Sequence, residues 1–138
     1  MIRHFEVKDL IEFRPNKHSH PGDIKFVFAD ERYEKYTYLN DGVVKAFMLL
    51  YDNGDREWGG FFLMADDFTA RDGVHLKRFV VYKIKEYNAR RVWTVSDKGD
   101  SKLDRWHEFL GFEKEGVMDV NGKLGNLWGM VWDSKHLH

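Results

Sequence analysis

The hydrophobic pattern between Arg32 and Ala65 predicts three consecutive strands. Two turn signals, Asn40-Asp41-Gly42 and Asp52-Asn53-Gly54-Asp55, each place Gly after Asn or Asp, which supplies the positive φ of a tight hairpin turn. They separate three runs of strand character: Arg32–Leu39, Val43–Tyr51 and Trp58–Ala65. The second and third runs are apolar almost throughout, which is typical of strands covered on both faces. We therefore expect an antiparallel meander with helices on both faces.

The next segment predicts a helix followed by a strand. From Val74 to Asn88, apolar residues recur at three- and four-residue steps and form one stripe, with Gly73 directly before it. Arg91–Val95 follows with β-branched and aromatic residues that favour a strand. A strand, a helix and a strand over this length form a βαβ unit, so Trp58–Ala65 and Arg91–Val95 should be parallel.

The remaining segments predict shorter elements. Leu103, Trp106 and Leu110 mark the buried side of a helix over Ser101–Leu110, which Gly111 is placed to end. Ser101 and Asp104 resemble a capping pair at its start. A final hairpin and an N-terminal strand and helix are expected at Phe112–Val120, Lys123–Trp132, Ile2–Val7 and Lys8–Phe13. His18–Gly22 has loop character and Ile24–Phe28 is ambiguous. The order β-α-β-β-β-α-β-α-β-β shows no repeat and no boundary, so we expect one domain over residues 1–138.

Composition narrows the classes of function. The 138 residues include 22 basic and 23 acidic side chains, a net charge of −1 that argues against a dedicated nucleic-acid or polybasic membrane binder. Cysteine is absent, which excludes disulfides, thiolate metal sites and cysteine catalysis. No apolar run approaches a membrane span, and the N-terminus lacks a signal-peptide pattern. We expect a soluble, cytoplasmic protein.

The order of elements and the segment Asp100–Phe112 resemble the GCN5-related N-acetyltransferase (GNAT) superfamily. The corresponding family segment commonly runs Asn-x-x-Ala-x-x-Leu-Tyr-x-x-x-Gly-Phe. Gly111 and Phe112 match, and the other motif positions are filled by Asp100, Leu103, Trp106 and, at the Tyr, His107. The stretch Trp93–Glu115 is also similar to small GNAT-like proteins of tailed bacteriophages, including the internal virion protein A type. The resemblance implies an α/β (α+β) fold with a mixed sheet, a meander plus a βαβ unit, and acetyl-CoA as co-substrate.

The same resemblance implies a location for acetyl-CoA. In GNAT proteins the two parallel strands splay, and the thioester arm enters between them. Backbone groups at Met64 and Ala65 would bond the pantetheine, and Asp100 would bond backbone near the arm, although as a helix cap it needs no functional role. The N-terminal end of the Val74–Asn88 helix would hold the pyrophosphate. The residues placed to contribute there are Arg71, Gly73, Val74, His75, Lys77 and Arg78.

One departure from the family pattern concerns this pyrophosphate loop. The family loop typically reads Gln/Arg-x-x-Gly-x-Gly/Ala, because the backbone must approach the phosphates closely. Here Gly73 is kept, but Arg71 is one residue too near, and His75 stands where Gly or Ala is expected. Asp72 adds a negative charge. His75 either covers the pyrophosphate or blocks it.

Candidate catalytic residues follow from the family chemistry, in which an amine attacks the thioester directly. His107 would replace the family's tyrosine as the acid that protonates the thiolate, because imidazole titrates near about pH 6.5; otherwise it is an ordinary residue of the helix surface. Asp66 and Asp67 could accept the amine's proton through water, or simply face solvent. Trp93 and Trp106 either line an acceptor pocket or pack in the core.

Two functions remain open at this point. One is a GNAT-type N-acyltransferase with an unknown small-molecule or protein amine as acceptor, and with the homodimer that such relatives often form. The other is a non-catalytic GNAT-like phage protein that acts as a virion component or binds a host partner, in the host cytoplasm or the virion. His18-Ser19-His20 and His136-Leu137-His138 lack a convincing third ligand, so we predict no metal site.

Overall fold

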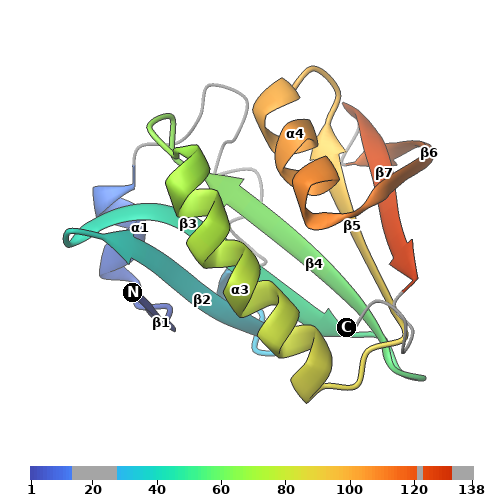
Figure 1. The fold of residues 1–138 in the computed structure, drawn as a ribbon, viewed down its shortest axis with the longest axis horizontal. Coiled ribbons are helices and arrows are strands. Elements are labelled where there is room, and N and C mark those ends of the chain that lie inside the picture. Colours follow the sequence, from blue (N-terminus) through green and yellow to red (C-terminus); the bar gives the residue numbers. More distant parts are fainter. Residues whose placement is uncertain (14–27, 121–122, 132–138) are drawn as a thin grey trace.

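The predicted meander forms the centre of a seven-stranded sheet. The computed structural model describes residues 1–13, 28–120 and 123–131, and its strand order is β1-β2-β3-β4-β5-β7-β6 (Figure 1). Neighbouring strands β2 (Tyr33–Asn40), β3 (Val43–Asp52) and β4 (Glu57–Met64) are antiparallel, and the short β1 (Ile2–His4) pairs with β2. At the first turn, Asp41 and Gly42 both have positive φ, 52° and 77°, as a two-residue hairpin turn requires.

The predicted βαβ unit is also present. Strand β5 (Arg91–Asp97) runs parallel to β4 and is connected to it through α3 (Ala70–Glu86). Strands β6 (Glu113–Val120) and β7 (Lys123–Val131) form the final hairpin, with β7 between β5 and β6. The parallel pair β4 and β5 therefore interrupts an otherwise antiparallel sheet. Such a switch point is where a ligand site is expected in an α/β protein.

Helix α3 begins at Ala70, four residues before the predicted start at Val74. The cause is a capping box: the Asp72 N–H donates to the Thr69 side chain, and the Thr69 N–H donates to the Asp72 carboxylate. The Thr-x-x-Asp spacing is a start signal that the apolar stripe alone does not show. Arg71, Asp72 and Gly73 consequently lie in the first helical turn and do not form a loop before it.

Helix α4 spans Ser101–Leu110, as predicted. Its N-cap is Asp100, whose carboxylate accepts from the Leu103 N–H at 3.1 Å, so the predicted Ser101–Asp104 pair does not cap it. Gly111 ends the helix with a φ of 100°. The short α1 (Lys8–Glu12) agrees with the N-terminal prediction.

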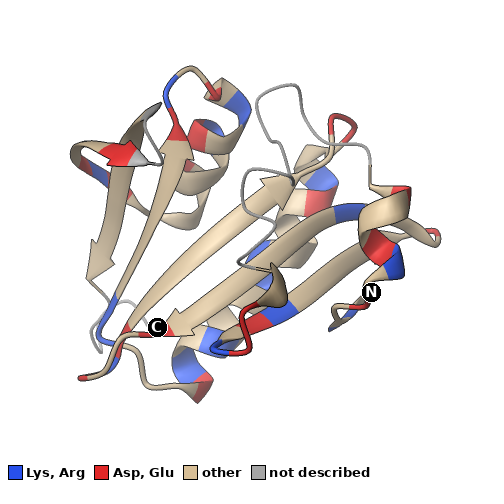
Figure 2. Ribbon diagram, turned by 180° about the vertical axis from the view of Figure 1, so that it is seen from behind, with Lys and Arg blue, Asp and Glu red and all other residues tan. Residues whose placement is uncertain are grey.

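The helices cover both faces of the sheet. Figure 1 shows α3 over β2 to β4 and α4 over β5 on one face, and Figure 2, from behind, shows α1 on the other. The larger core cluster lies under α3 and α4, and a smaller one, centred on Phe47, packs against the α1 side. Charged residues lie on helix surfaces, turns and strand ends, so the middle of the sheet is almost uncharged (Figure 2). Among the described helices, none has the length and apolar character to cross a bilayer.

Several sequence predictions fall outside the described residues. These are the loop His18–Gly22, most of Ile24–Phe28, the Asn121-Gly122 turn and both histidine pairs.

Candidate functional site

Strands β4 and β5 form a fork. Their pairing begins at Glu57 with Arg91 and ends at Gly60 with Thr94, although β4 continues to Met64 and β5 to Asp97. Figure 1 shows the two strands diverging beyond that point, with α4 in front of β5. We call the Gly60–Thr94 pair the vertex and the Met64–Asp97 end the mouth. The splayed strands that the resemblance implied are present.

The inner edge of β4 offers backbone groups to a ligand. Successive residues of a strand direct their N–H and C=O groups to opposite edges. The Ala65 N–H donates to the Lys45 carbonyl on β3 at 2.9 Å, so the backbone groups of Met64 and Phe62 point toward β5. Strand pairing between β4 and β5 stops before both residues. The backbone groups of Met64 are therefore open to an extended chain in the fork, whereas the Ala65 N–H is already used.

A cleft opens from the mouth of the fork, between the start of α3 and helix α4. It encloses about 300 Å³, and its walls come from the end of β4, the β4–α3 turn and both helices. Its lining residues are Met64, Phe68, Thr69, Ala70, Gly73, Lys102, Arg105, Trp106 and Phe109. The cleft has apolar walls and two cationic side chains, which suits a slender chain that carries phosphates.

The cationic side chains of the cleft come from α4. The Lys102 ammonium donates to the Ala65 carbonyl at 3.1 Å and to the Asp66 carbonyl at 2.6 Å, which ties α4 to the end of β4. Arg105 is exposed one turn further along and also lines the cleft. Sequence reasoning missed both residues, because on one chain they look like solvated charges on the polar side of a helix.

The start of α3 is already occupied by its own residues. Asp72 is 1% exposed, and its carboxylate accepts from the Tyr38 hydroxyl at 2.9 Å and from the Asn40 amide at 3.0 Å, besides the Thr69 N–H. Burial alone would raise the pKa of Asp72, but these hydrogen bonds outweigh it and lower the pKa. A fixed negative charge therefore stands at the helix N-terminus, where the resemblance places a pyrophosphate.

The backbone of the first turn is also partly used. The Gly73 N–H donates to the Thr69 carbonyl at 3.0 Å, as an ordinary helical bond. A Cβ on Gly73 would lie 3.5 Å from the Trp106 ring, an ordinary contact distance, so at this glycine the first turn of α3 packs directly against α4. The N–H groups of Ala70 and Arg71 have no partner among the described residues and remain for an anion.

The other predicted pyrophosphate residues of α3 are not gathered in the cleft. Val74, His75 and Arg78 are exposed, and His75 lines a separate hollow beside the β2–β3 turn, so it does not plug the fork. The Lys77 ammonium donates to the Phe109 carbonyl at 3.1 Å and lies over the Phe109 ring. Lys77 thus links α3 to the end of α4.

The two candidate proton acceptors lie just beyond the mouth. Asp66 and Asp67 are both exposed, and the Asp67 carboxylate pairs with the Lys45 ammonium at 2.6 Å. Asp100, which the resemblance placed near the arm of acetyl-CoA, is 1% exposed and serves as the α4 cap, the structural alternative given for it above.

His107 lies inside the molecule, which corrects the expectation of a surface residue beside the opening. It is fully buried, and its ring centroid is within 6 Å of those of Phe62, Phe112 and Trp128. Burial lowers the pKa of its imidazole to about 3, so the ring is neutral at pH 7. Neither ring nitrogen has a hydrogen-bond partner among the described residues.

Other buried polar atoms beneath α4 also lack a hydrogen-bond partner among the described residues. Thr94 Oγ1 and Trp106 Nε1 are buried and lack partners within the described part of the chain. Thr94 belongs to the vertex of the fork, and Trp106 lines the cleft. Trp106 contacts Phe62 and Phe68, so it serves the core and the cleft at once. Buried polar groups normally have partners, so these atoms are free to bond a ligand or an ordered water.

Solved acetyltransferases share this architecture at low sequence identity. IAA acetyltransferase from Bacillus cereus ATCC 14579 is 14% identical, with a TM-score of 0.71, and the match covers 96% of this chain and 99% of that one. The structure of AAC(6')-Ib in complex with ribostamycin and coenzyme A is 14% identical, with a TM-score of 0.68 and coverage of 95% and 92%. This chain has the GNAT fold.

A third neighbour extends the same result. Ribosomal-protein-S5-alanine acetyltransferase from Vibrio fischeri is 12% identical, with a TM-score of 0.66, over 96% of this chain and 93% of that one. No family model matches the sequence, and no curated protein matches it. At these identities the comparisons establish the fold, and the bacteriophage subgroup stays a prediction.

Proposed function

We propose that this protein is an N-acyltransferase that takes an acyl group from acetyl-CoA and transfers it directly to a primary amine. The observation that carries the proposal is the fork with the unpartnered His107 imidazole beneath it. An extended thioester arm needs backbone partners along its length and a polar partner at its sulfur. The inner edge of β4 supplies the first, and His107 supplies the second.

The proposed binding mode uses the cleft for the phosphates. Lys102 and Arg105 provide positive charge, and the N–H groups of Ala70 and Arg71 provide donors. Bound there, acetyl-CoA would supply the activated acyl group. Charge on α4 would compensate for the carboxylate of Asp72, which occupies the usual position of an anion at α3.

His107 would act as a hydrogen-bond donor. A neutral imidazole carries one N–H, which can stabilise negative charge that develops on a sulfur atom. Because its pKa is about 3, the ring holds no second proton to release near pH 7. Asp66 and Asp67, exposed at the mouth, would accept the proton of the attacking amine through water.

Binding is tested first by thermal unfolding with acetyl-CoA. At about 100 times its Kd, a ligand that binds only the folded state adds about 2.7 kcal/mol of stability. Arg105→Glu should weaken binding about tenfold or more, because it reverses a charge in the cleft. Lys114→Glu, an exposed reversal on β6, serves as the control and should leave binding unchanged. Failure of the wild type to respond to millimolar acetyl-CoA would overturn the proposal.

Transfer is tested by release of free CoA thiol with a panel of amines. Acetyltransferases among the solved neighbours are described with spermidine and ribostamycin, so these two join a peptide α-amine and a lysine side chain as probes. Transfer to at least one of these amines is expected.

One observation favours a second function, that of a non-catalytic GNAT-like partner-binding module or virion component. The capping box and the buried Asp72 give α3 a closed N-terminus where the fold usually receives phosphate. A protein of this kind would show no stabilisation by acetyl-CoA in the same experiment.

A further inference from the structure

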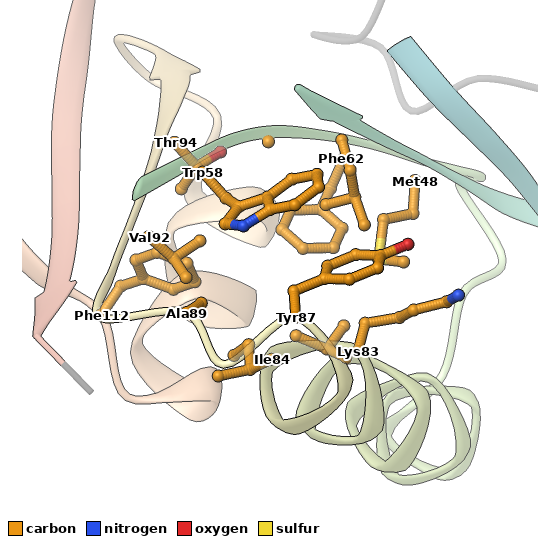
Figure 3. A pocket seen from close by; sticks show the side chains of 13 residues that line it. Met48, Trp58, Phe62, Lys83, Ile84, Tyr87, Ala89, Val92, Thr94 and Phe112 are labelled. Atoms are coloured by element: carbon orange, nitrogen blue, oxygen red, sulfur yellow. The ribbon is translucent and has the colours of Figure 1, made fainter. Parts of the chain in front are cut away.

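An apolar cavity lies beside the vertex of the fork, between α3 and the sheet (Figure 3). Its free volume is about 20 Å³, enough for one or two methyl-sized groups. Lys83 also borders it, but Figure 3 shows its ammonium directed away, and this ammonium pairs with the Glu86 carboxylate at 3.3 Å. The apolar walls come from Met48, Leu50, Trp58, Phe62, Val80, Ile84, Tyr87, Ala89, Val92 and Phe112.

Gly60 lines the cavity and has no side chain to reduce its volume. A Cβ on Gly60 would meet Leu50 Cδ2 at 3.5 Å and the Leu49 carbonyl at 3.6 Å, which are ordinary contact distances. Packing therefore allows an alanine at this position. The neighbouring Gly59 differs, since its Cβ would come within 2.8 Å of the Trp93 ring. Gly59 is required by packing, whereas Gly60 leaves space.

Thr94 borders this cavity and carries a buried hydroxyl close to it. Thr94, the β5 partner of Gly60, is 1% exposed, and its hydroxyl has no partner among the described residues. A buried hydroxyl without a hydrogen-bond partner lowers the stability of the fold unless a bound molecule supplies that partner. The Thr94 hydroxyl is thus an observation, separate from the cavity, that favours a polar atom of a bound molecule near the vertex of the fork.

The cavity is aligned with the fork. The fork is open at Met64 and closed at Gly60, so the acyl end of a thioester arm would reach the vertex first. Phe62 and Phe112 line the cavity and also contact the His107 ring, with centroid distances of 5.9 and 5.7 Å. The cavity is therefore next to the proposed position of the sulfur.

Trp58 and Tyr87 form the opposite end of the cavity. Their rings stack with centroids 4.2 Å apart and an interplanar angle of 12°. Trp58 lies two residues before Gly60 in β4, on the side of the vertex away from the mouth. This pair limits how far a carbon chain can extend.

We propose that the cavity is an acyl pocket that selects a short-chain acyl-CoA, with the propionyl or butyryl group favoured over acetyl. This inference rests on the proposed function and adds the acyl class to it. The thioester carbonyl oxygen would accept a hydrogen bond from the Thr94 hydroxyl. The one or two carbons beyond acetyl would fill the space beside Gly60. Stacked Trp58 and Tyr87 would exclude longer chains.

The test is calorimetric binding of free CoA and of its S-ethyl, S-propyl, S-butyl and S-octyl thioethers, which cannot react. In the wild type, each added carbon up to S-butyl should strengthen binding about fourfold, the value expected for a buried methylene, and S-octyl should bind no more tightly than S-butyl. Gly60→Ala should abolish this gain and leave free CoA binding unchanged. Gly116→Ala, a substitution on β6 with open space at its Cβ, should behave as wild type.

A second variant acts in the opposite direction. Trp58→Ala removes one ring of the closing pair and should shift the preferred thioether to a longer chain, with circular dichroism confirming the fold. Equal chain-length dependence in the wild type, Gly60→Ala and Trp58→Ala would overturn the acyl pocket while leaving acyl-CoA binding intact. Absence of binding by free CoA and every thioether would overturn the proposed function and the pocket together.

Discussion

The start of α3 and the inner side of α4 flank the same fork but differ in how their buried polar groups are satisfied. At α3, the carboxylate of Asp72 has partners on Tyr38, Asn40 and Thr69. Under α4, His107 and Trp106 have none among the described residues. Buried polar groups with hydrogen-bond partners stabilise the fold, whereas those without partners lower its stability. Groups of the second kind are retained where a ligand supplies the missing hydrogen bond. The comparison therefore favours a structural role for the start of α3 and is consistent with the ligand contact that we propose for α4.

This contrast is not a general property of α4. On the same side of the helix, the Ser96 hydroxyl donates to the Asp104 carboxylate at 2.6 Å, and Trp128 Nε1 donates to Ser96 Oγ at 3.0 Å. Among the buried atoms without a partner in the described part of the chain, Asn126 Oδ1 lies on β7, whereas those of Thr94, Trp106 and His107 lie nearer the fork. The location of the unpartnered atoms is what connects them with a ligand.

The largest effect is expected from Asp72→Ala. This change removes a helix cap and leaves the buried Tyr38 hydroxyl without its acceptor, so it should lower the free energy of unfolding by about 3 kcal/mol. Urea unfolding measures it. Asp66→Ala, an exposed carboxylate nearby, should change stability by less than about 0.5 kcal/mol. Equal effects of the two changes would mean that Asp72 is not the anchor of α3.

Asp9 is a second buried carboxylate with hydrogen-bond partners, and its contribution to stability depends on pH. Burial alone would raise the pKa of Asp9, but hydrogen bonds from Arg3, the Glu6 N–H and Thr37 outweigh it and lower the pKa to about 2. A lowered carboxyl pKa gives stability that is complete above about pH 5 and is lost as pH falls from about 4 toward 2. About 2 kcal/mol is expected, after allowance for screening at the partly exposed Arg3.

The measurement is the urea midpoint between pH 7 and pH 2.5. In Asp9→Asn this acid-induced loss should shrink, because the variant lacks the titrating group. A variant with an unchanged pH profile would show that Asp9 is not responsible.

His107→Phe tests the buried polar groups beneath α4 that lack hydrogen-bond partners. It removes two nitrogens without partners from an aromatic environment, so it should raise the free energy of unfolding by about 1.5 kcal/mol while acyl transfer falls at least tenfold. His4→Phe, an exposed matched change, should alter stability by less than about 0.5 kcal/mol. Because the pKa of His107 is about 3, wild-type turnover should show no inflection from this residue near pH 6.5. A destabilised His107→Phe would contradict the comparison.

The sequence predicts the elements well because their signals are local. The glycine turns, the apolar stripe of α3 and the glycine after α4 each depend on a few adjacent residues. The start of α3 was wrong because the apolar stripe begins after the Thr69–Asp72 capping box. A search for Thr-x-x-Asp before the stripe would have found it.

The candidate site was harder to predict because long-range packing forms it. His107 is buried by Phe62 on β4, Phe112 after α4 and Trp128 on β7, and no local pattern brings these together. Lys102 joins the site through carbonyls 36 and 37 residues away. The Gly60 space likewise depends on the distance between α3 and the sheet.

The smallest expected effect is that of Thr94→Val, which removes another buried polar group that lacks a hydrogen-bond partner. Valine has the shape of threonine without the unpartnered hydroxyl, so the free protein should be more stable by about 1 kcal/mol in urea unfolding. Thr37→Val is the matched control, because the Thr37 hydroxyl donates to Asp9 at 2.7 Å in a fully buried position. That change should destabilise the protein by about 1–3 kcal/mol. Two threonines that are almost fully buried on strands β2 and β5 of one sheet should thus respond with opposite sign, since only Thr37 has a partner among the described residues. Loss of stability in both variants would mean that the Thr94 hydroxyl is satisfied without a ligand.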